Sequence, residues 1–249
     1  MEIVESLRFR AQKRWFEMLR RFGISISSWP RLLVLVRHAE SEGNLLSVQE
    51  RADFDVSTHA YKLTPRGREQ ARITGEFLRN RYPQGFDVRY CSYYDRAQET
   101  MRLLFPGERY YTDPRLAEAQ RGVWHVAGCE RLQQLLPTEP LRKKREGLYH
   151  YRPIGGENWA DVELRIHSFL ETLSRDCAGK RVVIVVHGHW FILFQRMLEH
   201  FSIEEAEARY RAAVIDNASV TEYRGVHIRG QPRLFLSTST LTPWKGKIL

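Results

Sequence analysis

Two histidines, His38 and His187, stand where apolar runs end, and their positions are the strongest chemical signal in the sequence. The run over residues 32–36 leads directly into Arg37 and His38, and the run over residues 182–186 leads directly into His187. Buried strands have this composition, and in open parallel sheets ligands bind at the carboxyl ends of the strands. We therefore expect both imidazoles at one sheet edge, in an anion-binding site that contains a nucleophile.

These residue types suit phosphoryl transfer. A neutral imidazole at His38 can attack phosphorus and form a phosphohistidine, which divides one difficult step into two easier ones. The charge of Arg37 helps to keep the neighbouring imidazole neutral, because positive charge disfavours the imidazolium form. Arg96 follows a short expected strand and can reach the same edge. Guanidinium groups bind phosphate oxygens bidentately, so both arginines are candidate phosphate ligands.

Strands and helices alternate along the chain between these residues. The helix after the first strand is expected to begin at Thr64, a suitable N-cap, followed by Pro65, and to end at Tyr82. The alternation predicts an α/β fold with three layers, in which a mostly parallel central sheet has helices on both faces. The expected strands are residues 32–36, 88–91, 109–112, 182–186, 219–223 and 233–236, and the other expected helices are residues 94–104, 158–173, 190–198 and 203–213.

Two segments stand apart from this pattern. Residues 1–30 carry apolar side chains at helical spacing and basic side chains mostly elsewhere, which predicts an amphipathic helical extension ahead of a domain over residues 31–249. The extension is expected to pack on the domain or on a second copy in a homodimer, and binding to an anionic lipid surface is the alternative. Residues 119–157 form the least regular stretch, which is typical of a lid or a binding insertion.

Composition restricts the class of protein and its partners. The chain has 249 residues, 43% of them hydrophobic, which is ordinary for a globular protein. No apolar stretch approaches the roughly 20 residues of a membrane span. The three cysteines show neither zinc-site nor disulfide spacing, so we expect a cytoplasmic protein. The net charge of +9 favours an anionic partner: nucleic acid, a membrane surface or a small phosphorylated substrate. Because the chain carries no nucleic-acid-binding motif, nucleic acid is not expected.

An ordered set of blocks resembles the histidine phosphatase superfamily, which includes the cofactor-dependent phosphoglycerate mutases. The blocks lie between residues 31 and 225 and follow the order of the family. The resemblance implies a phosphoglycerate mutase-like fold for the domain. The blocks are LVRHAES at 35–41 with Asn44, LTPRGREQA at 63–71, SYYDRAQET at 92–100, LAE at 116–118, GVW at 122–124, GGE at 155–157 and VVHG at 185–188.

The resemblance also implies roles for individual residues. His38 matches the nucleophile of the family, and Glu118 matches the group that gives a proton to the leaving oxygen. His187 belongs with these catalytic residues and also with the groups that clamp the phosphoryl. The family's scheme needs no metal and no cofactor, and no ligand cluster in the sequence indicates one. The residues that match phosphate-binding positions are Arg37, Asn44, Arg96, His187 and Gly188.

The resemblance leaves three activities open. Residues 119–125 and 149–158 depart from the corresponding mutase segments, which favours a phosphomonoester hydrolase acting on a small phosphorylated metabolite through a phosphohistidine. A phosphotransferase of the cofactor-dependent phosphoglycerate mutase type is the alternative, if a second substrate hydroxyl is held where water would attack. A binding protein that keeps the phosphate pocket without turnover is the third, but the retention of His38, Arg96 and His187 favours an active enzyme.

Overall fold

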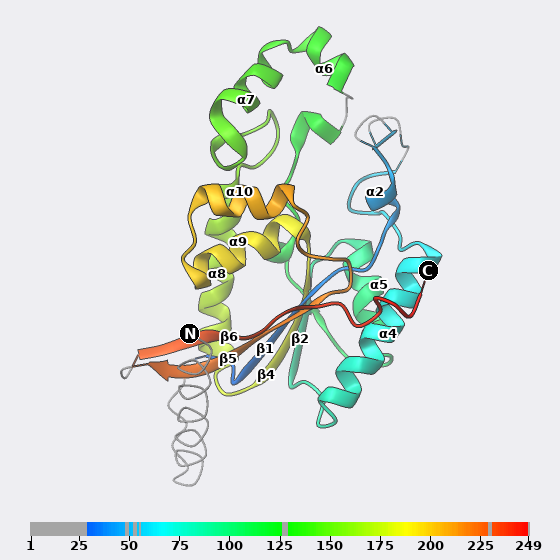
Figure 1. The fold of residues 1–249 in the computed structure, drawn as a ribbon, viewed down its shortest axis with the longest axis vertical. Helices are drawn as coiled ribbons and strands as arrows, with labels where there is room; N and C mark the ends of the chain where they lie inside the picture. Colours follow the sequence, from blue (N-terminus) through cyan, green and yellow to red (C-terminus); the bar gives the residue numbers. More distant parts are fainter. Residues whose placement is uncertain are drawn as a thin grey trace.

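The computed structural model describes residues 29–47, 50–51, 54, 56–125, 129–228 and 231–248, and a six-stranded sheet forms its centre (Figure 1). The predicted helical extension over residues 1–30 lies outside the described residues except for its last two. None of the helices within the described ranges is long and apolar enough to cross a bilayer. The strands are β1 (Leu32–Arg37), β2 (Val88–Cys91), β3 (Tyr111–Thr112), β4 (Arg181–Val186), β5 (Val220–Ile228) and β6 (Gln231–Leu241).

The strand order brings the two histidines together. The sheet has the order β3-β2-β4-β1-β5-β6. Neighbouring strands from β3 to β1 pair in parallel, whereas β5 pairs antiparallel with both β1 and β6. Arg37 at the end of β1 pairs with Val186 at the end of β4, and the His38 amide donates to the Val186 carbonyl at 2.8 Å. His38 and His187 therefore each follow the last paired residue of adjacent parallel strands.

Helices cover both faces of the sheet, which confirms the predicted three-layer α/β fold. α4 and α5 lie on one face, while α8 and α9 lie on the other, with α10 packed against α9 (Figure 1). The expected boundaries hold to within three residues, except that β5 and β6 each end five residues beyond the predicted strands. α9 begins two residues earlier than predicted, directly after His187. The helices of the two layers are α4 (Pro65–Arg81), α5 (Asp95–Leu104), α8 (Trp159–Asp176), α9 (Gly188–Glu199) and α10 (Ile203–Arg211).

The segment over residues 119–157 is more regular than its sequence indicated. It contains the 3-10 helix η2 (Gly122–His125), α6 (Cys129–Leu135) and α7 (Thr138–His150), so the expectation of an irregular stretch was wrong. These helices are short and largely polar, and the positive φ of 73° at Gly147 interrupts α7, so no helical apolar stripe was visible in the sequence. Its assignment as an insertion into a domain over residues 31–249 stays a prediction.

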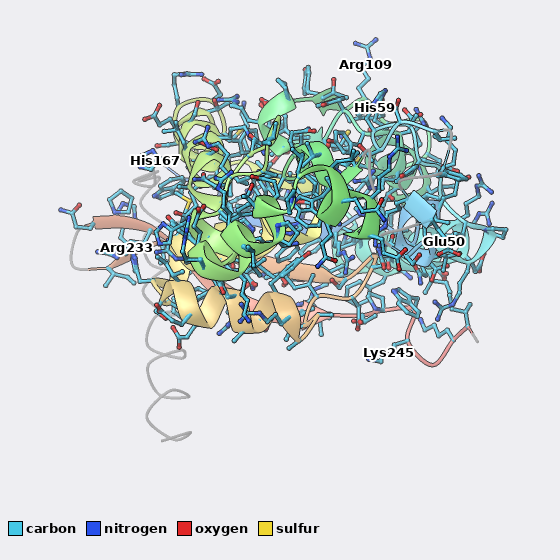
Figure 2. The ribbon with its side chains drawn as sticks, turned by 90° about the horizontal axis from the view of Figure 1, so that it is seen from above. Glu50, His59, Arg109, His167, Arg233 and Lys245 are labelled. Carbon is cyan, nitrogen blue, oxygen red and sulfur yellow. The ribbon has the colours of Figure 1, made fainter. Side chains whose placement is uncertain are left out.

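α6 and α7 lie at the end of the molecule toward which β1 and β4 run. In Figure 1 they form the top of the structure, and the short helix α2 (Glu42–Leu45), which follows the loop after His38, lies lower on the right, at about the height of α10. From above, the green segment that contains them lies in front of the sheet (Figure 2). α7 contacts α8 and α10, which anchors this segment to one helical layer.

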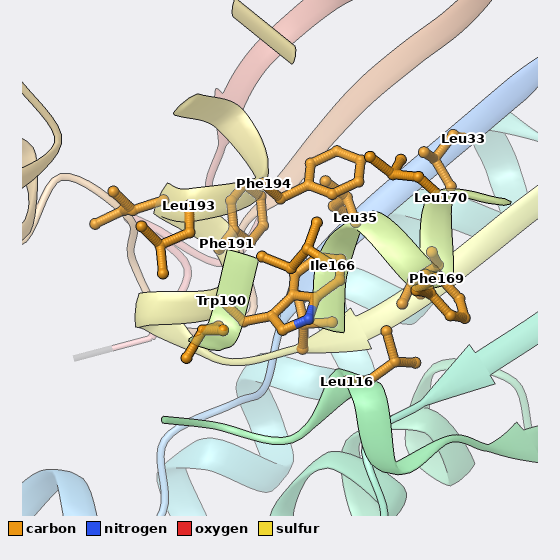
Figure 3. Packing of buried hydrophobic residues seen from close by; sticks show 14 of the residues in the cluster. Leu33, Leu35, Leu116, Ile166, Phe169, Leu170, Trp190, Phe191, Leu193 and Phe194 are labelled. Carbon is orange, nitrogen blue, oxygen red and sulfur yellow. The ribbon is translucent and has the colours of Figure 1, made fainter. Parts of the chain in front are cut away.

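The continuous apolar runs of β1 and β4 follow from burial on both faces. Leu33 and Leu35 face the cluster formed with α8 and α9, where the rings of Trp190 and Phe194 stack at 5.1 Å (Figure 3). The alternate residues of β1 face the cluster formed with α4 and α5. A central parallel strand therefore has no solvent face that would favour polar residues, and the first polar positions come where the strand leaves the core.

A glycine in α4 fixes the distance between this helix and the loop after His38. A Cβ at Gly67 would lie 1.9 Å from the Glu40 carbonyl oxygen, which also accepts from the Thr64 amide at 3.1 Å. We expect Gly67→Ala to lower the free energy of unfolding by about 1–3 kcal/mol, since the backbone must move to admit the methyl group.

Urea unfolding would measure this change, with Glu76→Ala on the exposed face of the same helix as the control. The control should change the free energy of unfolding by less than about 0.5 kcal/mol. Equal stabilities for the two variants would contradict the proposed close approach.

Candidate active site

A cavity opens at the carboxyl ends of β1 and β4, and it brings together most of the residues singled out in the sequence. His187 is the exception among them: it is fully buried and lies behind His38 rather than on the cavity wall. Within the described ranges, no group of three or more histidine, cysteine or carboxylate side chains is placed to hold a metal ion. The predicted residues that line the cavity are Arg37, His38, Asn44, Arg96, Glu118 and Gly188.

The hydrogen bonds of His38 define which ring nitrogen carries the proton. Nδ1 lies 2.7 Å from the Ala39 carbonyl oxygen, which can only accept, so Nδ1 is the protonated nitrogen. Nε2 lies 3.2 Å from Nε of Arg96, which can only donate, so Nε2 carries the lone pair. The imidazole is thus neutral, with its nucleophilic nitrogen held beside a guanidinium group.

The surroundings of His38 keep this neutral form at physiological pH. Burial lowers the pKa of His38 well below its ordinary value, and the charges of Arg96 and Arg37 lower it further, as would a proton on the neighbouring His187. The hydrogen bond with the Ala39 carbonyl acts in the opposite direction, but its effect is smaller. A positively charged, buried neighbourhood therefore provides the unprotonated imidazole that nucleophilic attack requires.

Arg96 is buried and Arg37 is half-buried, and neither cation has a carboxylate partner within the described part of the chain. Arg96 donates from Nη1 to the Thr58 carbonyl at 2.7 Å, and its guanidinium lies 4.7 Å from the centre of the Tyr94 ring. Arg37 donates to the Ile215 carbonyl, while its buried Nε has no hydrogen-bond partner. Burial lowers the pKa of Arg96 to about 10, so the side chain stays charged near neutral pH. Both arginines can therefore bind an anion in the cavity.

His187 is held between aromatic rings rather than by hydrogen bonds. Its ring centre lies 5.0 Å from that of His38 and 5.0 Å from that of Tyr94. Neither ring nitrogen has a hydrogen-bond partner among the described residues. Burial, followed by the charge of Arg96, lowers the pKa of His187 well below its ordinary value, so this ring is also neutral.

Glu118 is the only carboxylate on the cavity wall within the described residues, and it is ionised in this structure. Burial raises the pKa of Glu118, but the proximity of His189 and His187 and the Ala119 amide outweigh burial and hold that pKa well below its ordinary value. Oε1 accepts from the Ala119 amide at 3.0 Å, and Oε2 lies 3.2 Å from Nδ1 of His189. The His189 amide also donates to Oε2, at 3.3 Å.

Asn44 and Gly188 line the cavity but also have other structural roles. Asn44 Oδ1 accepts from the amide and the hydroxyl of Ser41, both at 3.0 Å, in the cap that begins α2. The Asn44 amide NH₂ group is therefore the part that can donate to a ligand. A Cβ at Gly188 would come no closer than 3.8 Å to Arg37, so packing within the protein does not itself require a glycine at this position.

Several cavity residues carry no signal in the sequence. Among the other histidines, His125 and His189 line the cavity, whereas the exposed His59 does not. His189 contacts Glu118 because α9 begins directly after His187, and only the helix geometry reveals this contact. The cavity residues that sequence reasoning missed include Arg51, Tyr61, Arg121 and Tyr210.

The family follows from a comparison with known proteins. A family model described as "Histidine phosphatase superfamily (branch 1)" matches residues 33–235. The chain belongs to the histidine phosphatase superfamily. The match spans both strands that deliver the histidines, and the shared arrangement is phosphoglycerate mutase-like, as the sequence predicted.

Relatives in the superfamily include mutases and phosphatases. Phosphoglycerate mutase-like protein AT74 from Arabidopsis thaliana is 32% identical over 200 residues, which are 72% of this chain but only 60% of that protein. A 2,3-bisphosphoglycerate-dependent phosphoglycerate mutase from Methylobacterium radiotolerans is 33% identical over 166 residues, 64% of this chain and 74% of that protein. A mycobacterial glucosyl-3-phosphoglycerate phosphatase in complex with inorganic phosphate has the same fold, with a TM-score of 0.63 at 24% identity over 86% of this chain and 98% of that one.

The two buried neutral histidines predict a stability that depends on pH. An unfolded chain binds a proton at each histidine below about pH 6.5, whereas folded His38 and His187 have lower pKa values and do not. Stability is therefore lost as the pH falls from about 6.5 toward the folded pKa values, because the unfolded state then binds more protons. We expect the thermal midpoint to fall between pH 7.5 and pH 5, and His187→Asn to reduce this pH dependence.

Thermal unfolding across this pH range would measure the effect. His59→Asn is the matched control, because His59 is exposed and outside the cavity (Figure 2), and it should keep the pH dependence of the parent protein. A slope in His187→Asn as steep as that of the parent would refute the assignment of a neutral, buried imidazole at this position.

Proposed function

We propose that this protein is a phosphomonoester hydrolase that acts on a small phosphorylated metabolite through a phosphohistidine at His38. The observation that carries the proposal is the pairing of a lone-pair Nε2 with the Arg96 guanidinium inside a cavity that also contains Arg37 and Glu118. A nucleophile, two phosphate-binding cations and one carboxylate are the components that a two-step phosphoryl transfer needs.

In the first step, the phosphoryl group lies between Arg37 and Arg96, and Nε2 of His38 attacks phosphorus. The N–P bond forms as the P–O bond to the leaving alcohol breaks, and the alcohol oxygen takes a proton from Glu118. The tautomer of His38 suits this step, because Nδ1–H stays bonded to the Ala39 carbonyl while Nε2 reacts. The neutral ring of His187 is buried with its centre 5.0 Å from that of His38 and supports the nucleophile from outside the cavity, while the Asn44 amide and the backbone at Gly188 complete the phosphate site.

Glu118 must gain a proton before it can donate one, since its pKa is low without substrate. A phosphate dianion beside the carboxylate raises that pKa by charge repulsion, so substrate binding favours proton uptake. His189, 3.2 Å from Oε2, is the nearest group through which this proton can arrive. After the first step the carboxylate is again ionised, and it serves as the base for the water that hydrolyses the phosphohistidine.

Transfer to a second substrate hydroxyl is the alternative outcome, since one of the relatives is a mutase. Hydrolysis is proposed because the segment after Glu118, which begins Ala119-Gln120-Arg121, departs from the mutase pattern. Product analysis separates the two: a hydrolase releases inorganic phosphate from a monophosphate, whereas a mutase returns a positional isomer.

The first prediction from this mechanism concerns the nucleophile. The protein is expected to hydrolyse p-nitrophenyl phosphate without added metal, and a chelator should leave the rate unchanged, because the attacking group is an imidazole. We expect His38→Ala to lower kcat by at least about 1,000-fold, as happens when a covalent nucleophile is removed. His59→Ala, the exposed histidine control, should retain the activity of the parent. Residual activity near the parental rate in His38→Ala, or complete loss on chelation, would exclude the mechanism.

The second prediction concerns the proton donor. Glu118→Gln should slow alkyl phosphates by about 100- to 10,000-fold, because a poor leaving group needs a proton in the transition state. Aryl phosphates with good leaving groups should be affected much less in the first step. The dependence of kcat/KM on leaving-group pKa measures this difference, with the exposed Glu130→Gln as the control. Equal losses for both classes of substrate would assign the proton donor to another residue.

A further inference from the structure

We infer that Arg51, Tyr61 and Arg121 form a second anion-binding subsite in the same cavity, so that the preferred substrate carries another anionic group on its leaving alcohol. The three residues line the cavity beside the phosphoryl site, and none of them belongs to the residues with which the sequence resembles the superfamily. The inference rests on the proposed phosphatase function and adds the class of its substrate.

The cavity wall carries an excess of positive charge. The described cavity wall carries four arginines and one carboxylate, Glu118. A phosphoryl dianion between Arg37 and Arg96 leaves Arg51 and Arg121 without an anion, because neither has a carboxylate within ion-pair distance among the described residues. Arg51 donates from Nε to backbone carbonyls only, at 3.0 Å to Leu46 and 3.3 Å to Ser47.

The hydroxyl of Tyr61 is unpartnered among the described residues. Tyr61 is 3% exposed, and its buried hydroxyl has no hydrogen-bond partner in the described part of the chain. A buried hydroxyl without a partner is energetically unfavourable, so such a group at a cavity wall indicates a ligand. The ring packs closely over Gly43, since a Cβ there would lie 2.5 Å from Cδ2 of Tyr61.

The backbone that carries Arg121 is held in place. Arg121 forms a bridge with Gly156, and the amide of Val123, two residues further on, donates to the Ile154 carbonyl at 3.0 Å. Gly122 has a φ of 52°, and a Cβ there would lie 2.0 Å from the Ile154 carbonyl oxygen. Because the backbone of this turn is already ordered, ligand binding has to order only the side chain of Arg121.

The position of Arg121 places the subsite on the side of the leaving group. Arg121 follows Glu118 by three residues, and Glu118 is the proposed proton donor to the leaving oxygen. The charges are also close to one another: Arg51, Arg96 and Arg121 all act on the pKa of Tyr61, which burial raises overall. His125 adds no charge, because burial, followed by Arg121 and Arg51, lowers its pKa to about 4.

Two guanidinium groups and a phenol hydroxyl can all donate hydrogen bonds to an anion, so their common ligand is a carboxylate or a second phosphate.

Matched pairs of substrates distinguish these two anionic groups. One pair is 3-phosphoglycerate and glycerol 3-phosphate, which differ in a carboxylate. The other is fructose 1,6-bisphosphate and fructose 6-phosphate, which differ in a phosphate. We expect kcat/KM to favour the more anionic member of at least one pair by about tenfold or more, roughly the worth of one charge-assisted hydrogen bond.

Variants test whether these residues cause the preference. Arg121→Gln and the isosteric Tyr61→Phe should each reduce the ratio of kcat/KM within the preferred pair at least several-fold. Arg109→Gln, an exposed arginine away from the cavity (Figure 2), should leave the ratio unchanged. Thermal midpoints would establish that the variants fold. Parental protein that treats both pairs alike, or variants that slow every substrate by the same factor, would overturn the inference.

A binding measurement separates this inference from the proposed function. Calorimetry with the same pairs, using His38→Ala to prevent turnover, reports the subsite whether or not the protein is a phosphatase. Tighter binding of the more anionic member, lost in His38→Ala/Arg121→Gln, supports the subsite. Equal binding of both members contradicts it, even if p-nitrophenyl phosphate is hydrolysed. Conversely, a parental protein that turns over no phosphomonoester but keeps the binding preference would contradict the proposed function alone.

Discussion

The contact between Arg96 and His38 is the constraint on which the rest of the site depends. A guanidinium beside Nε2 and a carbonyl beside Nδ1 leave one tautomer and one charge state for the ring. The backbone supports both partners, because the Ala39 amide donates to the Thr100 hydroxyl, which in turn donates to the Arg96 carbonyl. The first turns of α5 and the loop after β1 are therefore one hydrogen-bonded unit, and the nucleophile cannot move independently of its cation.

This arrangement leaves a cationic cavity that an anion completes. Arg96 is buried and Arg37 is half-buried, and neither has a carboxylate partner in the described structure, whereas other arginines are paired, such as Arg165 with Glu157 at 2.8 Å. Charges that are buried and unpaired cost free energy, so their persistence at a cavity is a mark of binding rather than of folding. Glu118 is the only carboxylate on the described cavity wall, and His189, His187 and the Ala119 amide hold its pKa low. A phosphate dianion beside it raises that pKa, which couples the proton of Glu118 to the arrival of substrate.

The sequence predicted many of the site residues, and the parts of the site that it did not predict have identifiable physical reasons. The positions of His38 and His187 at strand ends followed from apolar runs that only a doubly covered strand requires. Their adjacency, by contrast, needed the pairing of β1 with β4, which residues 149 positions apart do not reveal. The helices over residues 129–150 were missed because their apolar faces are small. The contacts of Asn44 with the cap of α2 and of His189 with Glu118 depend on exact helix starts, which patterns locate only to within a few residues.

The sequence by itself determined the fold class and the identity of the main cavity residues, because burial on two faces, helix caps and the family's blocks are local and leave their mark on neighbouring positions. Only the tertiary structure decided the tautomer of His38, the ionised state of Glu118, the recessed position of His187 and the presence of Arg51, Tyr61 and Arg121 on the same wall. Tautomers and charge states depend on burial and on partners that the fold brings from distant segments, and no spacing along the chain encodes those distances.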